Sequence, residues 1–112
     1  MAEPTGTYCI VWITAGSLQE ASALAHVLVE EHLAACCSVL PGIRSVYRWQ
    51  GKVHEDEEHL LFCKTRRSLF APLVTRVREL HSYELPEIIC TDITEGSAPY
   101  LKWIDESLSA AL

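Results

Sequence analysis

The sequence predicts an α+β domain, in which one antiparallel sheet of four strands carries helices on one face and an extra helix follows near the C-terminal end. Apolar residues make up 49% of the 112 residues and occur along the whole length. Segments with strand-like and helix-like apolar spacing alternate, and turn residues separate them. A chain of this length forms about one domain. We therefore expect a single domain over residues 1–112, with an ordered core at about 8–108.

The first strand and helix are predicted by a change in apolar spacing. Residues 8–14, YCIVWIT, are apolar on both alternating faces, which is typical of a central strand. Ser17 followed by Glu20 forms a capping box, which begins a helix that runs to about Leu33. The core-facing residues expected on this helix are Ala21, Leu24, Ala25 and Leu28.

A long β-hairpin is predicted next. Residues 35–49 are rich in β-forming residues but are interrupted at Pro41–Gly42, which indicates an edge strand with a bulge. Gln50–Gly51 predicts a tight turn, and residues 52–65 return as a second long strand. The hairpin is longer than the first strand, so its tip must stand free or be buried on a partner. We interpret it as an oligomerisation arm.

The remaining elements complete a βαββαβ order with one more helix. Ser68 is predicted to cap a second helix with Pro72 in its first turn. Residues 87–93, EIICTDI, predict the fourth strand, and Ser97 is expected to cap a third helix. The core-facing residues expected on these two helices are Leu69, Leu73, Val77, Leu80, Leu101, Ile104 and Leu108. This order is that of the ferredoxin-like, split βαβ arrangement.

Composition excludes several classes of function. The formal net charge of −6 argues against a nucleic-acid partner, because phosphate binding depends on clustered Lys and Arg. No apolar run approaches the ~20 residues that span a bilayer, and the first residues, MAEPTGT, show no secretion signal. We therefore expect a cytoplasmic protein that binds neither membrane nor nucleic acid. Five cysteines without zinc spacing predict free thiols.

Topology separates the two most reactive candidate side chains. A right-handed crossover makes the first two strands parallel. Cys36, which begins the second strand, then lies at the end of the sheet where the first strand begins. His81 lies at the opposite end, with residues 13–16 and Trp49. A thiolate–imidazole pair of Cys36 and His81 is thus unexpected within one subunit. Cys36 itself is either a buried apolar residue or a possible thiol site.

The segment HSYELPE, residues 81–87, is the main candidate site. His81 is a candidate metal ligand, and Tyr83, Glu84 and Glu87 could join it in binding a ligand. Pro86 fixes a rigid bend that would present these side chains. The alternative is that His81 and Tyr83 pack at a corner between helix and strand or at a subunit contact. The residues alone are compatible with both interpretations.

A second dense cluster, HEDEEH at residues 54–59, also allows two interpretations. On a strand, one face carries His54, Asp56 and Glu58 and the other carries Glu55, Glu57 and His59. Each set offers oxygens and one imidazole that could bind a divalent cation. A charge-guarded edge strand explains the same pattern. The sequence shows no catalytic triad, paired catalytic carboxylates or nucleotide-binding glycine motif, and the loop after the first strand lacks the arginine of an acyl-phosphate hydrolase. We expect no enzyme and no required cofactor.

Several motifs occur together: LAAC, Y-x-W-x-G-K, K-T, H-x-Y-x-x-P-E and YLxWI. With these motifs the chain resembles the CutA, or divalent-cation tolerance, family over about residues 8–108. The resemblance implies a ferredoxin-like fold, a stable homotrimer whose long hairpins pack across subunits, and a role in tolerance to copper and other divalent metals. It also implies similarity to PII signalling trimers, which bind small ligands in clefts between subunits.

The resemblance also bears on copper. In some family members the proposed copper ligands are a cysteine at the end of the first strand and two adjacent histidines before the tyrosine. Here Ile13 and Leu80 occupy two of those positions, so only His81 remains as a ligand for a divalent cation. The first hypothesis is a metal-tolerance trimer with an intersubunit cleft near Trp49, His81, Tyr83 and Glu87. The alternative is a PII-like signalling or scaffold trimer.

Overall fold

The computed structural model describes residues 7–109, and its elements follow the predicted order. They are β1 (Tyr8–Ala15), α1 (Leu18–Glu30), β2 (Cys36–Trp49), β3 (Lys52–Arg66), the 3₁₀ helix η1 (Arg67–Leu69), α2 (Phe70–Leu80), β4 (Ile88–Asp92) and α3 (Ala98–Leu108). Residues 1–6 and 110–112 lie outside the described residues. They include most of the segment MAEPTGT, in which the sequence shows no secretion signal. Within residues 7–109, no helix is both long and apolar enough to cross a bilayer.

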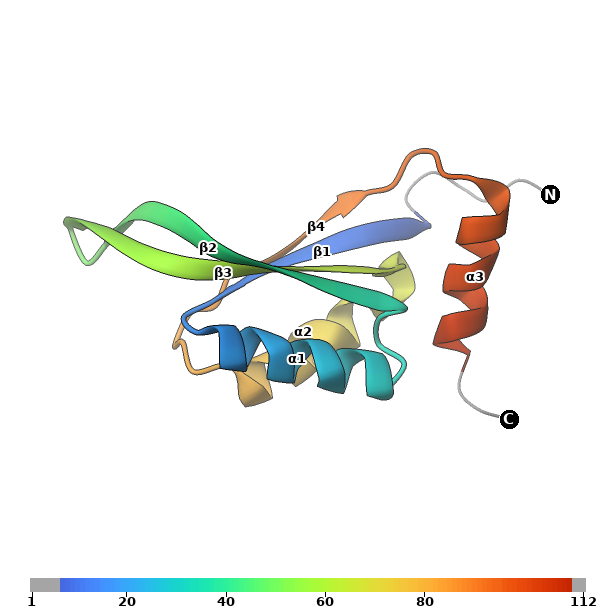
Figure 1. The fold of residues 1–112 in the computed structure, drawn as a ribbon, viewed down its shortest axis with the longest axis horizontal. Coiled ribbons are helices and arrows are strands. Elements are labelled where there is room, and N and C mark those ends of the chain that lie inside the picture. Colours follow the sequence, from blue (N-terminus) through green and yellow to red (C-terminus); the bar gives the residue numbers. More distant parts are fainter. Residues whose placement is uncertain (1–6, 110–112) are drawn as a thin grey trace.

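The four strands form a single sheet in the order β2-β3-β1-β4, and every neighbouring pair is antiparallel. Figure 1 shows α1 and α2 together beneath this sheet, while α3 stands against the end of the sheet where β1 begins. The strand order and the helices on one face confirm the ferredoxin-like fold.

The core lies between the sheet and the two helices α1 and α2. In β1 and β3 every second side chain faces the helices, as the two-residue period of a strand requires. The fully buried apolar side chains that meet here from the sheet and from the two helices are Val11, Ile13, Leu61, Leu24, Leu28, Leu73 and Val77. The predicted apolar faces of the first two helices are thus confirmed in their central turns.

The helix starts follow the sequence only in part. The Ser17 hydroxyl accepts a hydrogen bond from the Glu20 amide at 3.1 Å, which confirms the predicted cap of α1. The prediction that Ser68 caps the second helix is wrong, because η1 occupies this position and α2 begins at Phe70 without a side-chain cap. Leu80, which was expected to face the core, is 41% exposed, whereas the next residue, His81, is buried.

The β2–β3 hairpin has the predicted break and turn. The register shifts between Leu40 and Ile43, and the turn residues Gln50 and Gly51 both have positive φ, at 52° and 78°. Two consecutive positive φ values match a type I′ hairpin turn, which suits the right-handed twist of the strands. β1 pairs with β3 only from His59 onward. The outer part of the hairpin therefore has no third strand, and in Figure 1 it projects from the body of the molecule.

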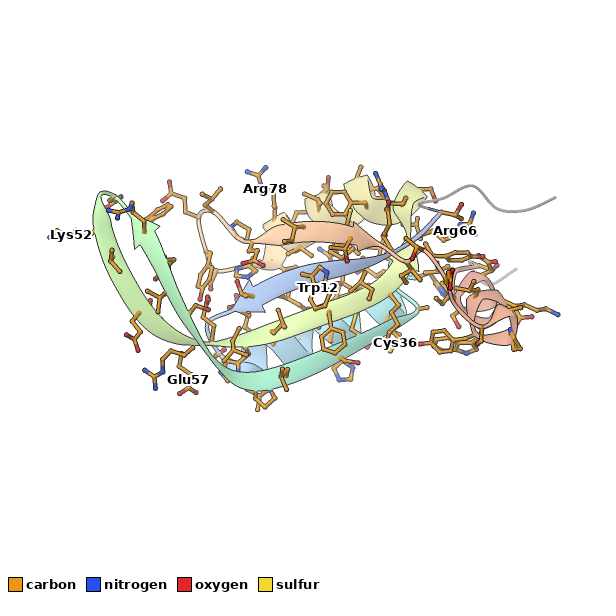
Figure 2. All side chains as sticks on the ribbon, turned by 90° about the horizontal axis from the view of Figure 1, so that it is seen from above. Trp12, Cys36, Lys52, Glu57, Arg66 and Arg78 are labelled. Atoms are coloured by element: carbon orange, nitrogen blue, oxygen red, sulfur yellow. The ribbon has the colours of Figure 1, made fainter. Side chains whose placement is uncertain are left out.

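The sheet face opposite α1 and α2 is also apolar, and we call it the open face. Trp12 and Phe62 stack there with ring centroids 5.7 Å apart. Figure 2 looks onto this face, with Trp12 near its centre and Lys52 at the far hairpin tip. Among the described residues no helix covers the middle of this face. Its apolar side chains are Ile10, Trp12, Leu40, Leu60, Phe62 and Ile89.

Candidate functional site

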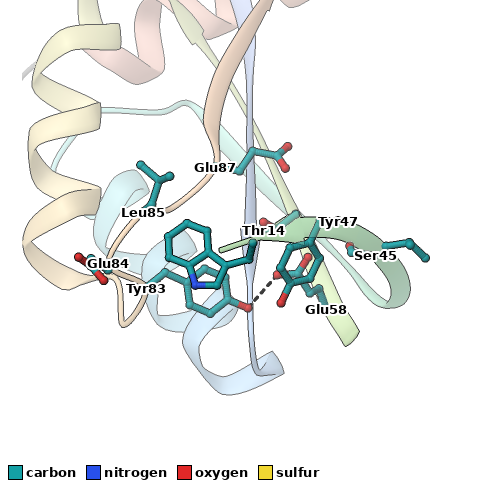
Figure 3. A pocket seen from close by; sticks show the side chains of 10 residues that line it. Thr14, Ser45, Tyr47, Glu58, Tyr83, Glu84, Leu85 and Glu87 are labelled. Carbon is teal, nitrogen blue, oxygen red and sulfur yellow. Dashed lines mark hydrogen bonds between the residues drawn. The ribbon is translucent and has the colours of Figure 1, made fainter. Parts of the chain in front are cut away.

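A pocket of about 640 Å³ opens where the hairpin leaves the sheet, and we call it the hairpin pocket. Its walls come from the end of β1, the outer part of the hairpin and the segment between α2 and β4 (Figure 3). A volume of this size is typical of small-molecule sites. The ten residues that line it are Thr14, Ser45, Val46, Tyr47, Trp49, Glu58, Tyr83, Glu84, Leu85 and Glu87.

His81 lies behind the pocket and holds one of its walls in place. The imidazole is fully buried, and its Nε2 donates to the Thr14 carbonyl oxygen at 2.7 Å. Its Nδ1 accepts from the Tyr83 backbone N–H at 3.0 Å. These two bonds define the neutral Nε2–H tautomer. Both ring nitrogens are therefore engaged within the protein, and His81 ties the end of α2 to the end of β1.

Glu20 fixes the same segment from the side of α1. Its carboxylate accepts from the Ser82 amide at 2.7 Å and from the Ser82 hydroxyl at 3.1 Å. Burial opposes ionisation of Glu20, but the hydrogen bonds from Ser82 outweigh it and lower the pKa of Glu20 below its ordinary value of 4.5. The predicted capping box is thus only half formed, because this carboxylate reaches Ser82 across the loop.

Tyr83 connects this segment to the hairpin. Its hydroxyl donates to the Glu58 carboxylate at 2.7 Å, the bond drawn dashed in Figure 3. The ring packs so closely on Gly16 that a Cβ there would lie 3.1 Å from the hydroxyl oxygen. Burial, followed by the hydrogen bond to Glu58, raises the pKa of Tyr83 above its ordinary value of 10. The phenol is therefore neutral at physiological pH and acts as a hydrogen-bond donor.

The hairpin contributes a second tyrosine–carboxylate pair. The Tyr47 hydroxyl donates to Asp56 on the adjacent strand, and this bond raises the pKa of Tyr47. Trp49 lies next to the turn, where it pairs across the hairpin with Lys52. Tyr47 and Trp49 are 41% and 37% exposed, so both rings are partly accessible.

The structure brings most of the predicted site residues together. Trp49, Tyr83 and Glu87 all line the hairpin pocket, while His81 supports it from behind. Within residues 7–109 no group of three or more His, Cys, Asp or Glu side chains is arranged to hold a metal ion. The metal role of His81 stays a prediction, and the two hydrogen bonds of its ring favour a supporting role.

Ile13 and Leu80 occupy the positions where the resemblance places copper ligands. The two side chains lie in different environments. Ile13 is fully buried in the core between the sheet and the helices, whereas Leu80 is 41% exposed. Neither side chain offers a donor atom to a metal.

The thiols lie at the other end of the sheet. Cys36 pairs with Lys64, which in turn pairs with Ile10, four residues before Thr14 on β1. Four strand residues span roughly 13 Å, so Cys36 is not a partner of His81. All five cysteines are free.

Cys37 and Cys63 lie opposite each other, with their sulfur atoms 3.1 Å apart. Their hydrogen bond, followed by burial, raises the pKa of the Cys63 thiol, which disfavours a reactive thiolate.

Sequence reasoning missed the central role of Glu58. The alternation of the HEDEEH cluster correctly grouped Glu58 with Asp56 on one strand face. It did not reveal that each carboxylate accepts from a tyrosine, one of which lies 25 residues away in the sequence. Tyr47 was likewise not identified as a lining residue, whereas Thr14 belongs to the segment 13–16 that the topology placed at this end of the sheet.

Comparison with known proteins gives a consistent result. A family model described as "CutA1 divalent ion tolerance protein" matches residues 9–107. The "Divalent-cation tolerance protein CutA" of Thermus thermophilus is 48% identical over 98 residues, which cover 88% of this chain and 95% of that protein. "Protein CutA, chloroplastic" of Arabidopsis thaliana is 46% identical over 98 residues, or 88% of this chain, but the match spans only 54% of that relative.

Solved structures agree with the sequence relatives. The crystal structure of CutA1 from Oryza sativa matches with a TM-score of 0.90 at 39% identity, covering 96% of this chain and 98% of that one. The Thermus thermophilus structure matches with a TM-score of 0.87 at 47% identity, covering 89% of this chain and 97% of that one. The chain belongs to the CutA1 divalent ion tolerance family.

Proposed function

We propose that this chain forms a homotrimeric, non-enzymatic protein of the cytoplasm, which supports tolerance to divalent metal ions and binds a small ligand in the hairpin pocket. The single observation that carries the ligand part is the place of the pocket. One wall of the pocket is the end of β1, which His81 holds in place. Another wall is the outer hairpin, which lies beyond the chain's own core. A ligand or a neighbouring subunit that contacts the hairpin would therefore also affect the pocket.

Two apolar surfaces support the homotrimer. The open face exposes large side chains such as Leu40 at 52% and Ile89 at 54%, and the outer hairpin exposes Val46 at 64% and Val53 at 63%. Apolar surfaces of this kind mark contact sites in proteins that associate. Sheet faces that pack against one another, with hairpins reaching across, would bury both surfaces at once.

The link to metal is supported by the family and by the printed names of the relatives. Two routes are compatible with it. In the first, the protein binds copper or another divalent cation weakly, with His81 as one ligand. In the second, a PII-like trimer binds an organic ligand and acts on metal tolerance indirectly. The second route is favoured by the hydrogen bonds that occupy both nitrogens of His81 and by the lack of any His or Cys among the pocket residues.

Growth of cells that lack their own family member tests the proposal. Cells expressing the wild-type chain should grow in raised copper, and cells expressing the double variant Trp49→Leu and Glu58→Gln should not. Trp103→Leu, on the exposed surface of α3, is the matched control and should behave as wild type. Full rescue by the pocket variant would remove the pocket from the proposal.

Calorimetric titration with Cu²⁺ separates the two routes. Equal and negligible heats for wild type and His81→Ala support the indirect route. A binding heat that His81→Ala abolishes, while the variant remains folded by circular dichroism, supports direct binding.

A further inference from the structure

The hairpin pocket has an unusual combination of charges. Three carboxylates line it, from Glu58, Glu84 and Glu87, and none of the ten lining residues is Lys, Arg or His. Low-dielectric walls strengthen the field of such like charges. The lining therefore favours a positively charged ligand and disfavours nucleotides, phosphates and carboxylic acids.

Glu58 is the most buried of these three carboxylates. It is 8% exposed, and its one hydrogen-bond partner among the described side chains is the neutral Tyr83 hydroxyl. No basic side chain in the described part of the chain forms an ion pair with it. A buried carboxylate without a positive partner is costly. A cation in the pocket would supply the missing charge.

Aromatic rings make up much of the rest of the wall. Tyr47, Trp49 and Tyr83 line the pocket, and Figure 3 shows the two tyrosine side chains beside Glu58. Both phenol hydroxyls already donate hydrogen bonds to carboxylates. Aromatic faces attract ammonium groups, and cages of such rings recognise alkylated ammonium compounds.

Size and donor geometry distinguish an organic cation from a metal ion. A metal ion needs several convergent donors at about 2.0–2.6 Å, and within residues 7–109 no such group of His, Cys, Asp or Glu exists. A pocket of about 640 Å³ with apolar walls instead suits a molecule with a hydrocarbon body. We infer that the hairpin pocket binds a small organic ammonium compound, with its charged head near Glu58 and its apolar part against Trp49 and Leu85.

This inference rests on the proposed ligand role of the same pocket and names the chemical class of that ligand. Choline is a suitable probe, and 3,3-dimethylbutan-1-ol is its uncharged isostere. Both are titrated into the intact, ¹⁵N-labelled protein, and binding is followed by the NMR shifts of the Trp49 indole and of the backbone amides of the pocket. We expect choline to bind at least about tenfold more tightly than the alcohol, which corresponds to about 1.4 kcal/mol.

Matched variants locate the binding. Glu58→Gln and Trp49→Leu should each weaken choline binding about fivefold or more, through loss of charge and of the aromatic face. Glu57→Gln, the neighbouring exposed position on β3, and Trp103→Leu should leave it unchanged. If Glu58→Gln fails to fold, Glu87→Gln provides the second test, because this carboxylate is exposed at the pocket edge. It should weaken binding about twofold.

Several results would overturn the inference. They are no binding of choline, equal binding of the alcohol, or shifts confined to residues away from the pocket. A blocked trimethyllysine amide tests the other source of an alkylammonium head, a protein side chain, and tighter binding of this compound than of choline would contradict a small-molecule ligand. If choline fails while copper tolerance still depends on Trp49 and Glu58, the proposed function survives and the ammonium class does not.

Discussion

The outer part of the β2–β3 hairpin differs sharply from the helix-covered centre of the sheet. Ile13 and Leu61, near the centre of the sheet, are fully buried beneath α1 and α2. Val46 and Val53, on the outer hairpin, are 64% and 63% exposed, although Val53 belongs to the same strand, β3, as Leu61. An isolated two-stranded hairpin is at best marginally stable in water. The comparison indicates that one half of the molecule is stabilised by its own chain, whereas the proposed subunit contacts would stabilise the other half.

The largest effect expected is in the buried half. Leu61→Ala should lower the free energy of unfolding by about 3 kcal/mol, because it leaves a cavity in a closely packed core. Val53→Ala, in the outer part of the same strand, is the matched comparison and should cost less, because it removes a smaller side chain and leaves the core between the sheet and the helices intact. Urea denaturation at one fixed chain concentration measures both. A Val53→Ala loss equal to that of Leu61→Ala would show that the outer hairpin is as fully buried in the assembly as the core.

His81→Ala tests the junction between the two halves. The substitution removes the donor to the Thr14 carbonyl and the acceptor for the Tyr83 amide, so we expect a loss of about 2 kcal/mol. Because His81 positions Tyr83, the variant should also disturb the hairpin pocket, visible as a shift of the Trp49 signal in NMR spectra. Unchanged stability would contradict the supporting role of His81 and would favour a role in metal binding.

Gly16→Ala should have a smaller and more local effect. A Cβ at this position meets the Tyr83 hydroxyl at 3.1 Å, so the ring must move by a few tenths of an ångström. We expect a loss of about 1 kcal/mol, with the disturbance passed to Glu58 through the tyrosine. In the double variant with Tyr83→Ala the clash is absent, and the cost of the alanine should largely disappear. An equal cost in both backgrounds would place the strain elsewhere.

The smallest effect expected is the pH dependence that comes from Glu20. Its pKa is lowered in the folded protein, so the carboxylate stabilises the fold above its unfolded pKa of about 4.5, and this contribution is lost as the pH falls through the folded value. Glu20→Gln should therefore cost under about 1 kcal/mol near pH 7, and the difference from wild type should shrink near pH 3. Glu30→Gln, at an exposed position of the same helix, is the control. A difference that grows in acid would contradict the assignment.

The sequence was most informative about local structure. The element order, the Gln50–Gly51 turn and the break near Pro41–Gly42 were all predicted, because glycine, proline and apolar spacing act through neighbouring residues. Topology also brought Trp49 and Tyr83 to one end of the sheet.

Contacts between distant segments were not predicted. Neither the bonds from Ser82 to Glu20 nor that from Tyr83 to Glu58 has a local signal, because each joins groups that only the folded chain brings together. The Ser68 cap failed for a related reason. A serine near a helix start is a weak signal, and the 3₁₀ turn after β3 shifted the first residue of α2 to Phe70.

We propose that the exposed hairpin and the open face are subunit contacts, and the mass of the protein in solution shows whether the chains associate. Multi-angle light scattering after size-exclusion chromatography, performed over a range of concentrations, measures this mass. The account predicts three times the 12.5 kDa mass of one chain. A stable, folded species with the mass of a single chain would contradict it.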